Sequence, residues 1–345
     1  MVLNVFAVVI LSGLLIEYGL GVAARLLNLR ALDPAVPPPF RDVYDPERYR
    51  RSQQYTKVRT RFGLLTGTIR LAVVLAFWFA GGFAWLDRLV RALDVGSPAG
   101  GLLFIGALVV AAGLLGLPAA YYSTFVIEER FGFNRTTRAT FLADVAKSAL
   151  LALVLGTPLL AAVLALFERA GSLAWLWCWT VSVVFTLVVQ FVAPAWILPL
   201  FNKYRPLEND ELRRRISDYA SAVSFPVRGL FVIDGSRRSS KANAFFTGFG
   251  RNRRIALFDT LIDKHEPDEI VAVVAHEIGH YKKRHIPQGI LLGIVHTGVV
   301  FALLGFFMRQ DGLYGAFGVR NPRSMPAWSS SACSTPRSSC CSAWP

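Results

Sequence analysis

Long runs of apolar residues recur along most of the chain. Each run is about 20 residues long, which is the length that an α-helix needs to cross the hydrocarbon core of a bilayer. The runs cover residues 3–23, 64–86, 101–121, 149–167, 174–201 and 289–307. A soluble protein with this pattern would have to bury an unusual number of long uncharged helices, so we predict six membrane-spanning helices.

One long segment, residues 202–285, has the residue spacing of a water-facing domain. A helical period covers 208–223, a β-rich run covers 229–233, a hairpin is expected from 243–249 with 254–258, and a helix from 269–284. A sheet that directly precedes a helix offers an edge on which an extended peptide can pair. The same pattern also fits a sheet that serves packing only.

The composition supports an integral membrane protein, with 54% hydrophobic residues, 17% charged residues and a mean hydropathy of +0.44. The net charge of +14 is not gathered in one basic patch, so we predict no nucleic-acid partner. Lys and Arg concentrate in the first and third loops and in residues 202–285, and they are sparse in the second and fourth loops. By the positive-inside rule, the basic segments lie in the cytoplasm and the amino terminus faces outward. We expect the membrane to be the cell membrane, with the endoplasmic reticulum as the alternative.

Residues 276–280 read His-Glu-Ile-Gly-His within the last helix of this segment. Residues four apart share a helix face, so His276 and His280 can each direct one ring nitrogen at the same zinc ion, about 2.0–2.1 Å away. Glu277 can take a proton from zinc-bound water, whose pKa the ion lowers to about 7, and can return it to the leaving amine. The motif predicts a zinc peptidase, but a helix that merely places two histidines on one face has the same five residues.

Three polar residues near the motif are expected to have other roles. Glu269 lies about 10 Å along the helix axis from His276, so it cannot share an ion with both histidines. His285 follows His276 by nine positions, which on a continuous helix is half a turn from the metal face, so we expect a surface histidine. His296, in the last apolar run, is expected to pack or to line a polar cavity.

Several motifs occur in order along the chain and resemble those of the type I CAAX prenyl proteases, which are integral-membrane zinc metalloendopeptidases. They are YSTFVIEERFGFN at 122–134, PAWILPLFNKYRPL at 194–207, SSKANAFFTGF at 239–249, IALFDTL at 255–261 and the segment 269–285 around HEIGH. The resemblance runs from about residue 44 to residue 319, and the set of motifs is far more specific than HEIGH by itself.

The resemblance implies a ring of seven membrane helices around a large water-filled chamber, with the zinc site inside it near the cytoplasmic face. It implies one Zn²⁺ per chain, with His276 and His280 as ligands and Glu277 as the catalytic base. It also implies that Asn243 and Ala244 belong to the edge strand that lines the substrate. The partners would be the lipid bilayer and a CAAX-type protein or another membrane-associated peptide, cleaved near the membrane.

The chain departs from the family pattern after the motif. In the family, a glutamate beyond a further membrane span supplies the third zinc ligand, but here no glutamate follows Glu277 and the one later acidic residue is Asp311. Two histidines hold zinc more weakly than three protein ligands, so we expect reduced zinc affinity and a form that is either weakly active or inactive. The alternatives are a non-catalytic membrane remnant or a peptide-binding chamber, and, less favoured, a transporter.

The predicted fold class is mainly α: a polytopic α-helical membrane protein with a small α/β, zincin-like segment in the cytoplasm. We divide the chain into a five-span region (1–201), a metallopeptidase segment (202–285), a sixth span with its flank (286–320) and a tail (321–345). In the tail the apolar period stops and Ser, Cys, Trp, Pro and Arg dominate, which predicts disorder. We hypothesise a frameshift near Met325, which sequencing of the coding DNA would test.

Overall fold

The computed structural model describes residues 3–225, 227, 229–247 and 254–319. Six helical segments in these ranges are long and apolar enough to cross a membrane, which confirms the number predicted from the apolar runs. They are Val5–Arg30, Pro46–Phe79, Ala99–Glu128, Arg138–Arg169, Gly171–Phe201 and His285–Phe307. The protein is therefore a polytopic, mainly helical membrane protein with a small sheet.

Three of the spans are single α-helices, and the other three are interrupted by a π-helical turn. The continuous ones are α1 (Val5–Arg30), α2 (Pro46–Phe79) and α12 (His285–Phe307). The interrupted ones are α4 (Ala99–Tyr122) with the π-turn Ser123–Glu128, α5 (Arg138–Leu151) and α6 (Thr157–Arg169) around Ala152–Gly156, and α7 (Ala174–Val192) and α8 (Leu198–Phe201) around Ala193–Ile197. Pro194, inside the last of these turns, has no N–H to give to an α-helical ladder, which favours a local change of helix type.

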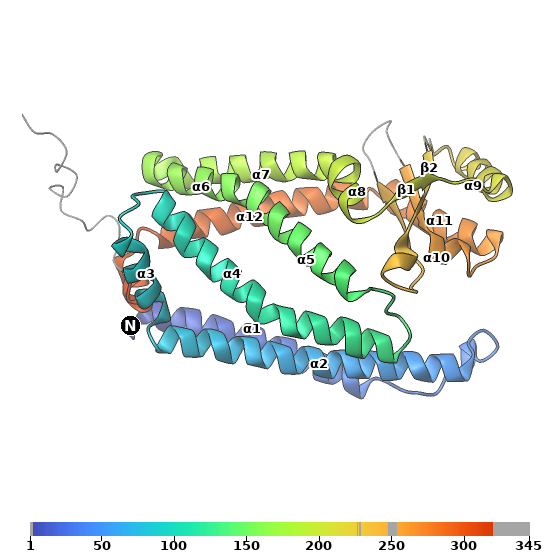
Figure 1. Cartoon of the computed structure of the whole chain (residues 1–345), viewed down its shortest axis with the longest axis horizontal. Helices are drawn as coiled ribbons and strands as arrows, with labels where there is room; N and C mark the ends of the chain where they lie inside the picture. Colours follow the sequence, from blue (N-terminus) through green and yellow to red (C-terminus); the bar gives the residue numbers. More distant parts are fainter. Residues whose placement is uncertain (1–2, 226, 228, 248–253, 320–345) are drawn as a thin grey trace, which may run out of the picture.

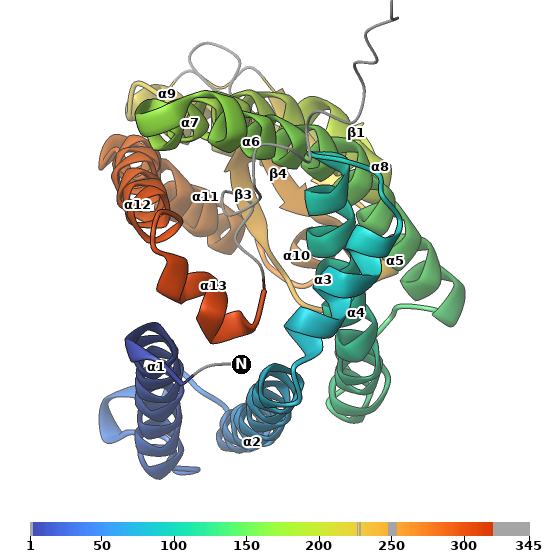
Figure 2. The ribbon, with the colours of Figure 1, turned by 90° about the vertical axis from the view of Figure 1, so that its left-hand side faces the viewer.

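The spans run roughly along the long axis of the molecule, with the α/β segment at one end (Figure 1). Seen along this axis, they follow a ring, with α1 and α2 at the bottom, α4 at the right, α6 and α7 at the top and α12 at the left (Figure 2). Short helices α3 (Gly82–Ala92) and α13 (Asp311–Phe317) lie at the end opposite the α/β segment. The seventh helix that the resemblance implies is not among the six spans of the described residues.

The second predicted span was wrong at its carboxyl end. We expected it to continue to residue 86, but α2 ends at Phe79 and α3 begins at Gly82. Gly81 between them has a φ of 75°, a left-handed conformation that glycine adopts at little cost and that ends a helix. Because α3 is also rich in apolar residues, hydropathy does not mark this turn.

The amino-terminal helices are tied to α13 at this end of the molecule. The indole Nε1 of Trp78 donates to the Ala316 carbonyl at 2.9 Å, and its ring stacks on Phe317 with centroids 5.4 Å apart. The Asn4 side chain donates to the Gly312 carbonyl at 2.6 Å. Residues more than 200 positions apart in the sequence therefore meet in a small buried cluster that contains Ala7, Trp78 and Ala316.

The water-facing segment contains a four-stranded sheet in the order β1-β2-β4-β3. The strands are β1 (Tyr204–Pro206), β2 (Gly229–Ile233), β3 (Ala244–Thr247) and β4 (Arg254–Phe258), and the helices are α9 (Asp210–Ala222), α10 (Asp259–Ile262) and α11 (Pro267–Lys282). β3 and β4 pair antiparallel, which confirms the predicted hairpin, and β2 lies parallel to β4. Residues 248–253, between the two strands of this hairpin, and the predicted tail 321–345 lie outside the described residues.

One hydrophobic core holds the sheet to α9 and α11. Its fully or almost fully buried members include Leu212 and Ile216 on α9, Leu257 on β4, and Val274 on α11. Burying side chains of this size contributes about 1.5–3 kcal/mol each, so the sheet and α11 form one packed unit.

Candidate active site

The helix that carries the His-Glu-Ile-Gly-His motif is α11. It starts with a capping box, in which the Glu269 carboxylate accepts a hydrogen bond from the Glu266 N–H at 3.1 Å and the Glu266 side chain accepts from the N3 backbone. Pro267 occupies the first turn, where its missing N–H has no partner to lose. The His265 ring and the Glu266 N–H lower the pKa of Glu269 by hydrogen bonding to its carboxylate. Glu269 therefore caps the start of the helix and lies away from the motif.

A stripe of apolar residues fixes the rotation of α11. Ile270, Val274 and Ile278 are spaced four apart and are buried in the core beneath the sheet. His276 and His280 lie off this stripe and are exposed, and Glu277 between them is half-buried. The packing of the helix thus keeps both histidines out of the core.

The imidazole rings of His276 and His280 lie in an edge-on contact. Their Nε2 atoms are 3.1 Å apart, and the ring planes are at 80° with centroids 4.7 Å apart. Two nitrogens held tetrahedrally by one zinc ion would be about 3.3 Å apart. The pair therefore fits half of a zinc site without a change of helix geometry, although within the described ranges no group of three His, Cys, Asp or Glu residues is placed to hold a metal.

The edge strand of the sheet lies next to this helix. β3 is the outermost strand in the sheet order and packs against α11. The Phe258 N–H donates to the Asn243 carbonyl at 3.0 Å, so Asn243 forms a hydrogen-bonded pair with β4. In an antiparallel ladder such pairs alternate, so the N–H and C=O of Ala244 and Phe246 face the open edge. The Ala244 N–H there donates to the Asn243 side-chain oxygen at 2.9 Å.

His285 is exposed, as expected, but the reason that we gave was wrong. The helix does not continue from His276 to His285: α11 ends at Lys282, Arg284 is left-handed with a φ of 56°, and α12 starts at His285. This turn brings His285 back to the site, with its Nδ1 2.8 Å from the Nδ1 of His280.

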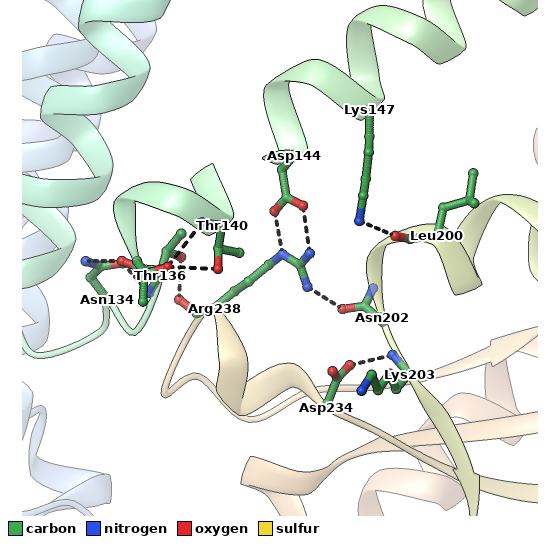
Figure 3. Close-up of polar contacts among 11 residues, drawn as sticks. Asn134, Thr136, Thr140, Asp144, Lys147, Leu200, Asn202, Lys203, Asp234 and Arg238 are labelled. Atoms are coloured by element: carbon green, nitrogen blue, oxygen red, sulfur yellow. Dashed lines mark hydrogen bonds and ion pairs between the residues drawn. The ribbon is translucent and has the colours of Figure 1, made fainter. Parts of the chain in front are cut away.

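An arginine from the α/β segment anchors this segment to the membrane helices (Figure 3). Arg238 donates from Nε and Nη2 to both carboxylate oxygens of Asp144 on α5, at 2.7 and 2.8 Å, and from Nη1 to the Asn202 side chain at 2.9 Å. The hydrogen bonds that Arg238 donates to Asp144 raise the pKa of Arg238 and keep it charged. Lys147, one turn further along α5, donates to the Leu200 carbonyl at 2.6 Å.

A second anchor joins the segment to α2 and to the end of the third span. Lys241 donates to the Glu128 carboxylate and to the Tyr55 hydroxyl, at 2.8 Å each, and the Tyr55 hydroxyl also donates to Glu128. Burial lowers the pKa of Lys241, but hydrogen bonds to Glu128 and Tyr55 outweigh it and hold this pKa above its ordinary value. Lys241 lies two residues before Asn243, so this anchor positions the start of the edge strand.

Sequence analysis missed these positioning residues for two different reasons. The ion pairs of Arg238 and Lys241 join positions 94 and 113 residues apart, and no local pattern signals such pairing. For His285 a signal was present: Pro287 is tolerated in the first turn of a helix but not inside one, so it marks a new helix that begins at about His285.

Two protein families match the chain. The family described as CAAX prenyl protease N-terminal, five membrane helices, matches residues 25–203, and peptidase family M48 matches residues 206–332. Together they cover most of the membrane region and all of the α/β segment except residues 204–205.

Individual relatives are also described as CAAX prenyl proteases. The chain is 38% identical over 299 residues to CAAX prenyl protease 1 of Saccharomyces cerevisiae, covering 82% of this chain and 65% of that protein. It is 33% identical over 304 residues to the CAAX prenyl protease 1 homolog of Arabidopsis thaliana, covering 85% of this chain and 72% of that protein. The crystal structure of S. mikatae Ste24p superimposes with a TM-score of 0.84 at 33% identity, covering 91% of this chain and 74% of that one. The chain thus spans just under two thirds of the length of the S. cerevisiae relative.

Proposed function

The chain belongs to peptidase family M48, and on this premise we propose that it is a membrane-embedded zinc metalloendopeptidase that cleaves CAAX-type or other membrane-associated peptides. The observation that carries the proposal is the pair of Nε2 atoms on His276 and His280, 3.1 Å apart on the exposed face of α11 with Glu277 between them.

Each polar residue of the motif has its own role in the proposed reaction. His276 and His280 would hold one zinc ion through Nε2. Zinc, when bound, lowers the pKa of a coordinated water to about 7 and polarises a substrate carbonyl. The Glu277 carboxylate takes a proton from the attacking water and delivers it to the leaving amine nitrogen.

The substrate peptide adds to the sheet along β3. The outward N–H and C=O groups of Ala244 and Phe246 form hydrogen bonds with an extended peptide. When the peptide binds, its carbonyl replaces the Asn243 side-chain oxygen as the acceptor for the Ala244 N–H. Because β3 packs against α11, this pairing holds the scissile carbonyl beside the histidines.

The test is a set of variants of the full purified chain, assayed for zinc content and for cleavage of a CAAX peptide. Glu277→Gln should keep zinc and stop hydrolysis, and His276→Ala and His280→Ala should remove zinc. Glu269→Gln is the matched control on the same helix, because glutamine also serves in a capping box. Loss of zinc in Glu277→Gln, or cleavage that survives it, would remove Glu277 from the assigned role.

A second candidate function is a non-catalytic remnant or peptide-binding chamber. The observation that favours it is that within the described ranges only two ligands converge and no group of three does. In that case the chain would bind CAAX peptide but would release no product, and Glu277→Gln would bind the peptide as well as the native protein does.

We place the α/β segment in the cytoplasm because the basic residues concentrate on that side. The membrane is the cell membrane or the endoplasmic reticulum. The division into 1–201, 202–285, 286–320 and 321–345 remains our prediction for the domain organisation.

A further inference from the structure

His285 contacts the ligand histidine His280 on the side away from the metal. The Nε2 of His280 faces His276, and its Nδ1 lies 2.8 Å from the Nδ1 of His285. The His280 and His285 rings are at 69° with centroids 5.0 Å apart. Because the contact is at Nδ1, His285 does not belong to the ligand pair, whose nitrogens meet at Nε2.

The proton positions in this contact follow from the assignment of His280 as a zinc ligand. A neutral imidazole carries one proton, and a metal can bind only the nitrogen that lacks it. If His280 binds through Nε2, its proton is on Nδ1. At 2.8 Å, His285 must then accept this proton's hydrogen bond through a bare Nδ1.

The backbone supports this contact from a different element. His285 is the first residue of α12, and Lys283 and the left-handed Arg284 separate it from the end of α11. Beyond it, α12 and α7 line a cavity of about 340 Å³ that reaches from His285 and Gln190 to Thr297. The position of His285 is therefore set by a membrane-spanning helix, and that of His280 by the α/β core.

We propose that His285 is a positioning residue, which accepts a hydrogen bond from Nδ1–H of His280 and so fixes the tautomer and ring orientation in which His280 binds zinc. This proposal rests on the proposed function, because it assigns His280 as a ligand. Partners of this kind typically change metal affinity by 10- to 100-fold when they are removed.

The experiment measures zinc affinity of the full detergent-solubilised chain by competition with a chelator, without reference to peptidase activity. His285→Leu keeps the shape of the side chain without an acceptor, and His285→Asn places Oδ1 where Nδ1 stands. We expect zinc affinity to fall about 10- to 100-fold in His285→Leu and to recover most of the way in His285→Asn. His296→Leu, a histidine replacement on the same helix, is the control and should leave the affinity unchanged.

A spectroscopic readout separates positioning from general damage. Cobalt(II) in the site should give a visible spectrum that is altered in His285→Leu and restored in His285→Asn. Equal zinc affinity in His285→Leu and the native chain would overturn the proposal, and so would equal losses in the Leu and Asn variants, since shape and not the hydrogen bond would then matter.

The same measurements distinguish this failure from failure of the proposed function. If the native chain binds zinc, His276→Ala loses it and His285→Leu retains it, only the role of His285 is wrong. If the native chain and His276→Ala bind zinc equally, or neither binds it, the metal site itself is wrong and the role of His285 falls with it.

Discussion

The guanidinium of Arg238 connects three parts of the chain that are far apart in sequence. It binds Asp144 in a bidentate pair on α5 and Asn202 at the end of the fifth span, while its own backbone carbonyl accepts from Arg135 N–H at 3.0 Å. The side chains of Arg238 and Asp144 are 22% and 24% exposed, so solvent screens this pair less than a surface ion pair. Planar bidentate geometry is a property of arginine that lysine cannot reproduce.

We predict that Arg238→Lys destabilises the protein by about 1–3 kcal/mol, because one charged hydrogen bond replaces three. Unfolding of the purified chain by denaturant measures this. Arg237→Lys, at the exposed neighbouring position, is the matched control and should change stability by no more than about 0.5 kcal/mol. Equal stabilities of the two variants would show that the bidentate pair contributes nothing.

For single residues, the sequence predicted those positions that depend on spacing within one helix. The sequence predicted that His276, Glu277 and His280 lie together on one helix, because four positions make about one helical turn, and the structure places them on α11. Arg238 was not, because its partner Asp144 is 94 positions away and pairing at that distance depends on the tertiary fold.

Among the elements, the junction of α11 and α12 has a strained residue. Arg284 has a φ of 56° and a ψ of 32°, where a side chain with a Cβ costs about 1–2 kcal/mol relative to glycine. The two helices are joined by only Lys283 and this left-handed residue, so their junction has little freedom to adjust.

We predict that Arg284→Gly unfolds at an equal or higher denaturant concentration than the native chain, whereas Arg284→Val loses about 1–2 kcal/mol or more, because a β-branched side chain is least tolerated at positive φ. Denaturant unfolding of the two variants side by side gives the comparison. A valine variant as stable as the glycine variant would mean that the junction relaxes to another conformation.

The open edge of β3 gives a prediction about the substrate. A peptide whose backbone pairs with Ala244 and Phe246 uses alternate amides, so N-methylation of those amides removes hydrogen bonds and adds bulk. We expect binding of such a peptide to weaken by about 10-fold, since one hydrogen bond contributes about 0.5–1.5 kcal/mol. N-methylation at the intervening positions is the control, and equal weakening from both peptides would argue against strand pairing.

Local periodicity predicted most elements and missed those that depend on tertiary contacts. The six spans, β2 and the β3–β4 hairpin have clear apolar patterns. β1 has only three residues, Tyr204–Pro206, and ends in a proline, so its pairing with β2 could not be seen in the sequence. The end of α2 at Phe79 depends on one glycine turn within a continuous apolar composition.

At the scale of the whole molecule, one membrane span separates the loop between α6 and α7 from the α/β segment. This loop and the α/β segment therefore lie on opposite sides of the membrane. Ser172 is in the former and Ser221 is on α9 in the latter, and both are exposed. The buried Cys178 and the three remaining cysteines can be replaced by alanine to give a background without thiols.

We predict that, in sealed vesicles with the cytoplasmic face inward, a membrane-impermeant maleimide labels Ser172→Cys at once and Ser221→Cys only after detergent is added. The two variants are matched, because each is an exposed serine replaced by cysteine. The reverse labelling order would place the α/β segment on the outer side and would contradict the positive-inside assignment.

The ring of spans and the position of the sheet at one end could be expected from the resemblance, but not from hydropathy, which gives the number of helices and not their order around a ring. The contacts of α13 with Trp78 and Asn4 close the far end by joining residues from both halves of the described chain. These contacts depend on how the helices pack in three dimensions, which cannot be predicted from the period of apolar residues.

Only two residues, Lys283 and Arg284, lie between α11 and α12, so the helix that carries the histidine motif has little freedom to move relative to α12. α12 has 23 residues and is about 35 Å long, against a hydrocarbon thickness of about 30 Å, so lipids of different chain length would change its tilt. We expect such a tilt to move His285, the first residue of α12, relative to the last turn of α11. We therefore expect the contact between His280 and His285 to depend on bilayer thickness.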